Sequence, residues 1–161
     1  ALVSDLVKAV RKYVEMFVNM IVRVVQINPS RGPHEAIRAT GRREYLNDEV
    51  VASMPRGRGG KAEVVFFKPD LSERNGYISD DDLEKECGSR GLIPADPYSL
   101  SAVNEDSAFA DERPNATHWK DSSGRWCYAA FHRWDDDGRD VSVDRGDDGW
   151  ADDWWFAGVR K

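Results

Sequence analysis

The sequence predicts a mixed α+β domain that is preceded by an amphipathic helix. Residues 61–68, KAEVVFFK, are rich in β-branched and aromatic residues and predict a strand. Two segments with helix-capping signals follow, at 79–91 and at 98–110. Residues 119–161 contain all six tryptophans and alternate apolar with polar residues between turns, which predicts a short antiparallel sheet. Strands, then helices, then further strands are typical of an α+β domain.

Residues 2–21 are predicted to form an amphipathic helix. Their apolar residues recur at alternating steps of four and three positions, which places them on one face as a heptad-like seam. This seam either packs on the rest of the domain or forms a short coiled coil, which would make the chain a homo-oligomer through residues 2–21. A β-branched run at 20–26 indicates that a strand begins near the end of the pattern, so we expect a helix at 1–20 and a globular domain at 21–161. The seam consists of Val3, Val7, Val10, Val14, Phe17 and Ile21.

Capping signals predict two short helices before the first long strand. A turn rich in proline precedes a helix at 34–40. Asn47 or Asp48 then caps a second helix, which Pro55 ends. The glycine-rich loop at 56–60 lacks the spacing of a phosphate-binding loop, so no nucleotide site is predicted there.

Two longer helices are predicted in the middle of the chain. Ser79 caps the helix at 79–91, and the aspartates of its first turn favour the positive end of the helix dipole. Asp96 or Ser99 caps the helix at 98–110.

The region after Pro114 predicts antiparallel strands. A strand, a turn and a second strand cover 119–134, and residues 154–159 form the last strand. Between them, residues 139–145, RDVSVDR, alternate strictly, so the two valines point to one face and the polar residues to the other. The polar face of this strand carries Asp140, Ser142 and Asp144.

Composition excludes several classes of function. The 161 residues carry a net charge of −6, which argues against general binding to a nucleic-acid backbone. Cys87 and Cys127 lack the spacing of a zinc site and are predicted to be buried thiols, with a single disulfide as the alternative. No apolar run is long enough to span a membrane, and residues 1–10 lack the features of a signal peptide.

Catalytic and metal sites find little support in the pattern. The many aspartates of the region 133–161 are interchangeable and single out no catalytic pair, so an enzyme is not expected and no cofactor is predicted. Residues 135–140, DDDGRD, resemble a calcium-binding loop. The sixth and twelfth positions of an EF-hand would fall on Asp140 and Gly146, so that match fails. An irregular calcium site stays open as an alternative.

The stretch 133–161 combines acids and indoles in an unusual way. Nine aspartates lie between Asp135 and Asp153, and four tryptophans lie in the same stretch. Disordered acidic tails are poor in aromatic residues, so this segment is expected to be folded. Trp154 and Trp155 are adjacent and must point to opposite faces of a strand, so one of them is predicted to be exposed or semi-exposed.

This pattern resembles the variable region of target proteins of diversity-generating retroelements, which end in a C-type-lectin-like domain. In those elements an error-prone reverse transcriptase misreads template adenines, and asparagine codons are the usual targets. The segment 81–105 and the ending WWFAGVRK also resemble this family, and the resemblance covers 62–161 well and 21–61 loosely. It implies a C-type-lectin-like fold with a short antiparallel sheet and two helices.

The resemblance also implies which residues vary. The ligand-binding, variable positions would lie in a region at about 132–153 and at the tryptophan that follows it, and most of them are one adenine change from asparagine. The residues between them would form a fixed scaffold: Trp134, Val141, Val143, Trp150, Trp155, Phe156, Ala157 and Gly158. The variable set is His132, Asp135, Asp136, Asp140, Ser142, Asp144, Asp147, Asp148, Asp152, Asp153 and Trp154.

The function implied is that of a hypervariable display protein. Its C-terminal surface would recognise a target protein or a component of a cell surface, without a chemical step. The protein itself would be displayed on a virion or on a cell surface. The alternative is a calcium-dependent carbohydrate-binding lectin, because clustered carboxylates also suit a hard cation.

Overall fold

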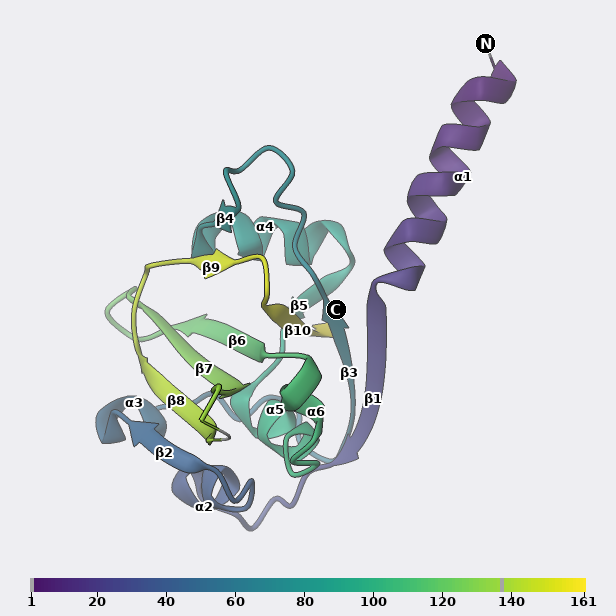
Figure 1. Ribbon diagram of the computed structural model, residues 1–161. Helices are drawn as coiled ribbons and strands as arrows, with labels where there is room; N and C mark the ends of the chain where they lie inside the picture. Colours follow the sequence, from purple (N-terminus) through teal and green to yellow (C-terminus); the bar gives the residue numbers. More distant parts are fainter. Residues whose placement is uncertain (1, 137) are drawn as a thin grey trace.

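Strands dominate the fold, with helices at the periphery (Figure 1). The computed structural model describes residues 2–136 and 138–161, and for residues 11–18 it describes the backbone alone. The strands are β1 (Met20–Gln26), β2 (Arg43–Leu46), β3 (Lys61–Phe67), β4 (Tyr77–Ile78), β5 (Leu92–Pro94), β6 (Asn115–Lys120), β7 (Trp126–Arg133), β8 (Arg139–Arg145), β9 (Trp150–Ala151) and β10 (Trp155–Arg160). The helices are α1 (Leu2–Val18), α2 (Pro33–Arg38), α3 (Asp48–Ala52), α4 (Asp80–Ser89), α5 (Pro97–Val103) and α6 (Phe109–Glu112).

Eight of the strands form one mixed sheet in the order β1-β3-β10-β6-β7-β8-β2, with β5 paired to β10. β10 runs parallel to β6 and β2 runs parallel to β8, whereas the pairs β1–β3, β3–β10, β6–β7 and β7–β8 are antiparallel. A separate two-stranded sheet pairs β4 with β9.

The predicted C-type-lectin-like fold, with a short antiparallel sheet and two helices, was wrong. Residues 119–161 were predicted to form a short antiparallel sheet, but β1, β2 and β3 from the first half of the chain extend it on both sides. β1 pairs with β3 along its full length, from Met20 opposite Phe67 to Gln26 opposite Lys61. Alternation identifies a strand, but it carries no information on a pairing partner far away in the sequence. The large mixed sheet was therefore missed.

The N-terminal segment divides into a helix and a strand. α1 ends at Val18, earlier than the predicted residue 21, and the predicted strand at 20–26 is confirmed. α1 projects away from the sheet (Figure 1), and its residues 2–10 are exposed, with Leu2 at 87% and Val3 at 75%. The first part of the seam therefore does not pack on its own domain. The side chains of Val14 and Phe17 lie outside the described residues.

The predicted caps are confirmed where the structure gives their hydrogen bonds. The Asn47 side chain accepts from two backbone amides at the start of α3, and the Ser79 hydroxyl accepts from the backbone amide of Asp82 in α4. The Asp96 carboxylate caps α5 by accepting from Ser99. Each such cap satisfies a donor that the first turn of a helix leaves unpaired.

The helix predicted at 98–110 was too long. α5 ends at Val103, and a separate turn forms α6 at 109–112. The buried Asn104 explains the break, because its amide donates to the Leu100 carbonyl and exchanges two hydrogen bonds of 2.8 and 3.1 Å with Asn115 of β6. A polar side chain with this choice of partners favours a helix end over continued helix.

Two hydrophobic cores lie on opposite faces of the large sheet. Val64 and Phe66 of β3 belong to one core, and Val65 and Phe67 belong to the other, as the alternation of a strand requires. Trp155 packs on the first core and Trp154 on the second, so both are partly buried. The prediction that the two rings point to opposite faces and that one of them is exposed or semi-exposed is confirmed.

No helix among the residues described is long and apolar enough to cross a membrane.

Both cysteines are free and buried, on opposite sides of the sheet. Cys127 lies in the first core and Cys87 in the second, so the predicted buried thiols are confirmed and the disulfide alternative is not formed. Burial raises the pKa of the Cys87 thiol to about 12, and burial also raises the pKa of Cys127. Reactivity requires the thiolate, which both sites disfavour.

We therefore expect neither thiol of the native protein to react with iodoacetamide at about pH 8, where a free cysteine is substantially ionised. Mass spectrometry of the intact protein measures this directly, and the same reaction in urea should alkylate both thiols. A native protein that gains one adduct within the same time would contradict the burial of that cysteine.

Candidate functional site

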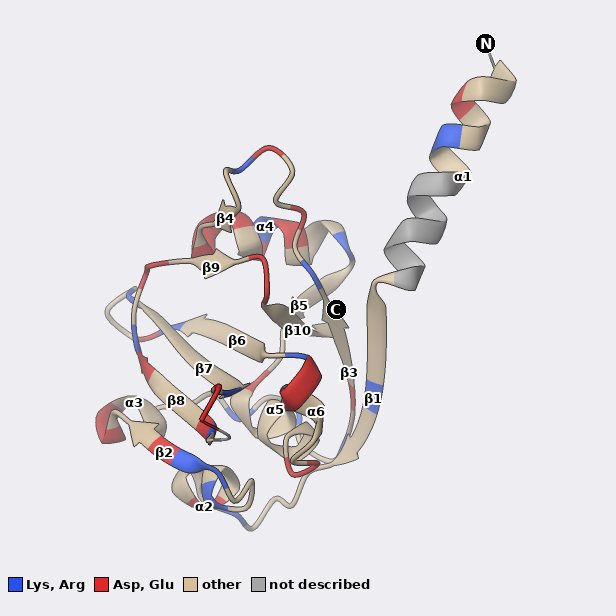
Figure 2. Cartoon of the chain, in the orientation of Figure 1, with Lys and Arg blue, Asp and Glu red and all other residues tan. Residues whose placement is uncertain are grey.

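Part of the predicted variable set lines one pocket. Four of its members, His132, Ser142, Asp148 and Trp154, line a cavity of about 280 Å³ between β7, β8 and the segment that carries β9. Figure 2 shows the acidic residues along the turn between β7 and β8 and on both sides of β9. The exposed members of the predicted set are Asp135, Asp136, Asp144, Asp147, Asp148, Asp152 and Asp153.

Strand alternation separates this surface from the core. Val141 and Val143 of β8 are 0% exposed and lie in the first core, while Ser142 lines the pocket and Asp144 is exposed. The predicted alternation of residues 139–145 is confirmed for these four positions. A side chain on the pocket face therefore changes without any change to the first core.

Asp140 departs from the pattern predicted for the polar face. It is 0% exposed, and its Oδ1 accepts a 2.6 Å hydrogen bond from Nε of Arg43 in the neighbouring strand β2. Its second oxygen, Oδ2, is buried and has no hydrogen-bond partner among the described residues. The prediction of an exposed ligand-binding side chain was therefore wrong at Asp140, because a strand from a distant part of the chain covers it.

Five aromatic rings form the walls of the pocket. Tyr128, Trp134 and Trp150 join His132 and Trp154 along its lining. His132 meets Trp134 at 4.6 Å between ring centroids and Trp154 at 6.0 Å. Trp150 meets Trp154 at 5.3 Å and Tyr128 at 5.9 Å. All four contacts are edge-to-face, with interplanar angles of 77–87°. Each such contact contributes about 0.5–1.5 kcal/mol beyond burial, so the walls are held together by the rings themselves.

Three of these aromatic residues were not in the predicted variable set, and one of them, Trp150, is a buried residue that was assigned to the fixed scaffold. Trp134 was assigned to the fixed scaffold, yet it is 58% exposed at the mouth of the pocket. Tyr128 was missed, although the period of a strand places it on the same face as Ala130 and His132. Extending the alternation of β8 to its neighbour β7 would have found it.

A buried carboxylate fixes the back wall of the pocket. Asp80 in the first turn of α4 is 4% exposed, and its Oδ1 accepts from Nε1 of Trp150 at 2.9 Å and from Nδ1 of His118 at 2.7 Å. A carboxylate can only accept, so His118 carries its proton on Nδ1 in this contact. The sequence interpretation placed Asp80 among solvated acids that favour the helix dipole, and it missed this bond.

The segment that carries Trp150 is also fixed by its backbone. Ile78 of β4 pairs with Trp150 of β9, which brings the two short strands together beside α4. Gly149 adopts a φ of 76°, and a Cβ at this position would lie 2.5 Å from the carbonyl oxygen of Ile78. Only glycine fits such a position without strain.

The charged side chains that line the pocket are all acidic. Asp80 and Asp148 are its only charged lining residues among those described, and no lysine or arginine lines it. Burial lowers the pKa of His132, and this effect outweighs the nearby Asp140, which raises that pKa. The imidazole therefore stays neutral at pH 7, where an unperturbed histidine is already mostly neutral.

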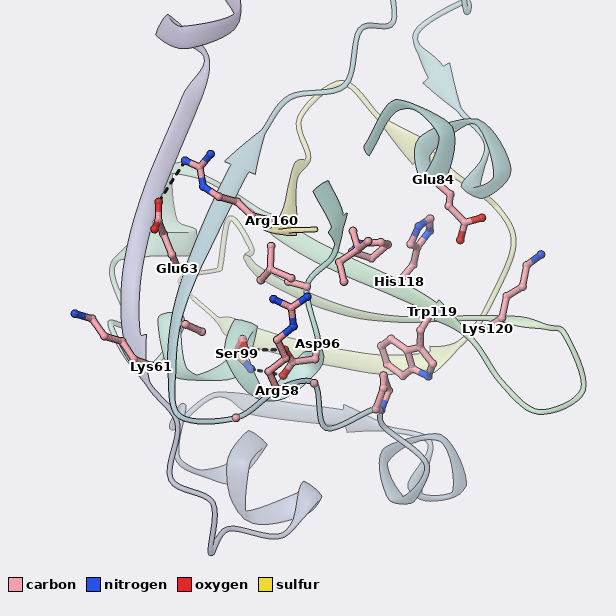
Figure 3. Close-up of a pocket in the computed structure, with 18 residues that line it drawn as sticks. Arg58, Lys61, Glu63, Glu84, Asp96, Ser99, His118, Trp119, Lys120 and Arg160 are labelled. Atoms are coloured by element: carbon pink, nitrogen blue, oxygen red, sulfur yellow. Dashed lines mark hydrogen bonds and ion pairs between the residues drawn. The ribbon is translucent and has the colours of Figure 1, made fainter. Parts of the chain in front are cut away.

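A larger cavity of about 520 Å³ lies on another part of the molecule (Figure 3). It is bounded by the loop 55–59 and by the ends of β3, β5, β6 and β10, and it contains none of the predicted variable residues. Its charges have both signs, and several are engaged within the fold. Glu63 pairs with Arg160 at 3.4 Å, and Asp96 caps α5. This cavity lacks the uniform charge and the aromatic walls of the smaller pocket.

Within residues 2–136 and 138–161, no group of three or more histidine, cysteine, aspartate or glutamate side chains is placed to hold a metal ion. The acids of the variable region spread over two turns and a strand end instead of converging on one point (Figure 2). Comparisons with protein-family models, with curated proteins and with solved structures gave no match to this chain.

The Asp80 contact leads to a stability prediction. Asp80→Ala removes the acceptor of two buried donors, and leaving buried donors unpaired is costly, so we expect a loss of about 3 kcal/mol in the free energy of unfolding. Asp80→Asn keeps an acceptor oxygen and should lose less. Urea denaturation followed by tryptophan fluorescence measures both variants.

The exposed Asp147→Ala serves as the matched control, with an expected change within about 0.5 kcal/mol. A loss at Asp80→Ala no larger than that of the control would show that the carboxylate does not hold Trp150 and His118.

Proposed function

We propose that this protein is a ligand-binding display protein whose C-terminal surface is diversified by a retroelement and recognises a target protein or a component of a cell surface. The observation that carries the proposal is the division of one short segment into a buried framework and a changeable surface. Val141 and Val143 are buried completely. Ser142, which lies between them, lines the pocket, and Asp144, which follows Val143, is exposed to solvent.

A surface that is diversified must tolerate many side chains without loss of the fold. Exposed loop and strand-face positions meet this requirement, because substitutions there usually change stability by less than about 0.5 kcal/mol. Seven of the predicted variable aspartates are exposed, and four of the predicted residues line a pocket. The predicted variable region therefore coincides with a surface that can change.

The composition of the surface also suits recognition. Rigid aromatic side chains provide contact area at a low cost in conformational entropy, and short polar side chains adapt their hydrogen bonds. Trp134 and Trp154 lie beside Ser142 and several aspartates on this face. Binding energy in protein interfaces is concentrated on such aromatic anchors.

The decisive test of diversification is genomic. We expect a near-copy of the 3′ end of the gene to lie beside a reverse-transcriptase gene, and the two copies to differ only where the template has adenine. Sequencing of the flanking DNA provides this comparison. Differences scattered equally over the codons of Val141, Val143 and Phe156 would contradict the proposal.

Tolerance of the surface leads to a second prediction. Replacing Asp147, Asp148, Asp152 and Asp153 by asparagine, one at a time, should change the free energy of unfolding by less than about 0.5 kcal/mol each. Val141→Asn places an unpaired amide in the core and should cost about 3 kcal/mol. Chemical denaturation measures both sets. Equal losses at the two kinds of position would remove the distinction between framework and surface.

We also propose that α1 joins copies of this chain, which would present several variable surfaces on one assembly. Val3, Val7 and Val10 of the seam are exposed at 75, 48 and 54%, and their heptad spacing suits an identical helix. Sedimentation of a chain that starts at Met20 should give a smaller particle than the full chain, beyond the mass of the missing residues.

Substitutions provide the matched control for self-association. Val7→Glu with Val10→Glu should dissociate the assembly, whereas Lys8→Glu, off the seam, should not. An unchanged particle for the chain that starts at Met20 would exclude α1 as the site of self-association.

A further inference from the structure

The aromatic pocket has the chemistry of a cation-binding site. Its lining combines five aromatic rings with two carboxylates, and the described lining contains no lysine or arginine. The nearby basic side chains are engaged elsewhere. Arg43 bonds to Asp140, and Arg42 donates to the carbonyl oxygens of Ser107 and His132. Negative charge inside the pocket therefore has no positive counterpart among its own walls.

The arrangement of the rings matters as much as their number. A cation is attracted to the face of an aromatic ring when it lies within about 6 Å of the ring centroid. The rings of Trp134, His132, Trp154, Trp150 and Tyr128 meet in succession at 77–87°, so they stand as the walls of a box. In each of these edge-to-face contacts the edge of one ring covers a face of its neighbour, whereas a parallel stack would cover a face of both rings. Aromatic boxes of this kind recognise quaternary ammonium and methylated ammonium groups.

We infer that this pocket binds an alkylated ammonium group on a ligand of net positive charge. Its volume of about 280 Å³ suits a small head group. Asp144 lies near Tyr128 and Asp153 near His132, and together with Asp148 of the lining they would repel a phosphate attached to the same head group. A cationic side chain such as a methylated lysine of a target protein fits these charges better than a phosphocholine. The inference rests on the proposed function, because it names the chemical class that this copy of the binding surface recognises.

Individual walls contribute to different degrees. Trp134 is 58% exposed and lies at the mouth, so its loss should leave the fold intact. Trp154 is partly buried, contacts both His132 and Trp150, and forms the centre of the box. Asp148 is exposed on the lining and contributes charge without a packing role.

The test compares a cation with a neutral molecule of the same shape. Choline and 3,3-dimethylbutan-1-ol differ in the charge of one central atom, so the difference in their binding isolates the cation–π and carboxylate contributions. We expect choline, tetramethylammonium and trimethyllysine amide to bind. Binding is measured by NMR shifts of the indole N–H signals or by tryptophan fluorescence. The neutral alcohol should bind at least about tenfold more weakly, and phosphocholine more weakly than choline.

Variants locate the site. Trp134→Ala and Trp154→Ala should each weaken choline binding by about tenfold or more, and Asp148→Asn by a few-fold. Tyr45→Ala is the matched control, because Tyr45 is an aromatic residue of similar exposure, 57%, that does not line the pocket. Its choline binding should equal that of the unchanged chain. Circular dichroism confirms that each variant is folded.

Each outcome separates this inference from the proposed function. Equal binding of choline and the neutral alcohol would leave an apolar pocket and overturn the cation specificity, whereas the genomic comparison would still decide diversification. Binding that Trp134→Ala and Trp154→Ala leave unchanged would overturn the location. The absence of binding by all three cations at millimolar concentration would overturn the inference altogether. It would not bear on the near-copy of the 3′ end that tests the proposed function. Phosphocholine binding tighter than choline would overturn the requirement for a ligand of net positive charge.

Discussion

The buried carboxylate of Asp80 is the contact on which the binding surface depends. It lies in the first turn of α4, and one of its oxygens receives the indole N–H of Trp150 and the Nδ1–H of His118. Three elements that are distant in the sequence, α4, β6 and β9, therefore meet at one atom. Hydrogen bonds to a charged acceptor are stronger than neutral ones, and leaving their donors unpaired in a core is costly. The orientation of Trp150, and through it the back of the aromatic pocket, follows from this contact. His118 in turn stacks on Trp126 at 4.1 Å, which extends the fixed part into β7.

A second constraint explains how a changeable surface coexists with a stable sheet. The two cores lie on opposite faces of the sheet; β7 contributes to both of them, and β8 contributes Val141 and Val143 to the first. The face that carries Phe131, Val141 and Val143 is buried completely, whereas the other face carries Ala130, Ser142 and the aromatic pocket. Because strand side chains alternate, each substitution on the pocket face leaves the first core untouched. For the pocket-side positions within these strands, His132, Ser142 and Asp144, the framework therefore lies one residue away in the same strand.

Local features of the structure were predictable from sequence, and long-range ones were not. The caps at Asn47, Ser79 and Asp96 follow from residue type and position, because the groups they satisfy lie within four residues. The faces of β8 follow from its alternation. The mixed sheet was not predictable, because the pairing of β2 with β8 joins residues almost one hundred positions apart. The same limit explains Asp80 and Asp140, whose partners Trp150 and Arg43 come from distant segments. A run of aspartates looks uniform in sequence, and only the fold distinguishes the buried ones.

Asp140 shows how the fold would restrict the diversification proposed for this surface. It resembles the other aspartates as a single-adenine change from asparagine, yet its side chain is buried and bonded to Arg43. Arg43 also reaches Asp136 at 3.5 Å and lies so close to Gly138 that a Cβ there would clash with its guanidinium. One arginine from β2 therefore ties together the turn between β7 and β8. A change at Asp140 leaves this cation without its shortest contact, whereas a change at Asp147 or Asp152 affects an exposed side chain. A side chain that is both buried and bonded to a residue outside the segment cannot vary freely, and by that criterion Asp140 belongs to the framework.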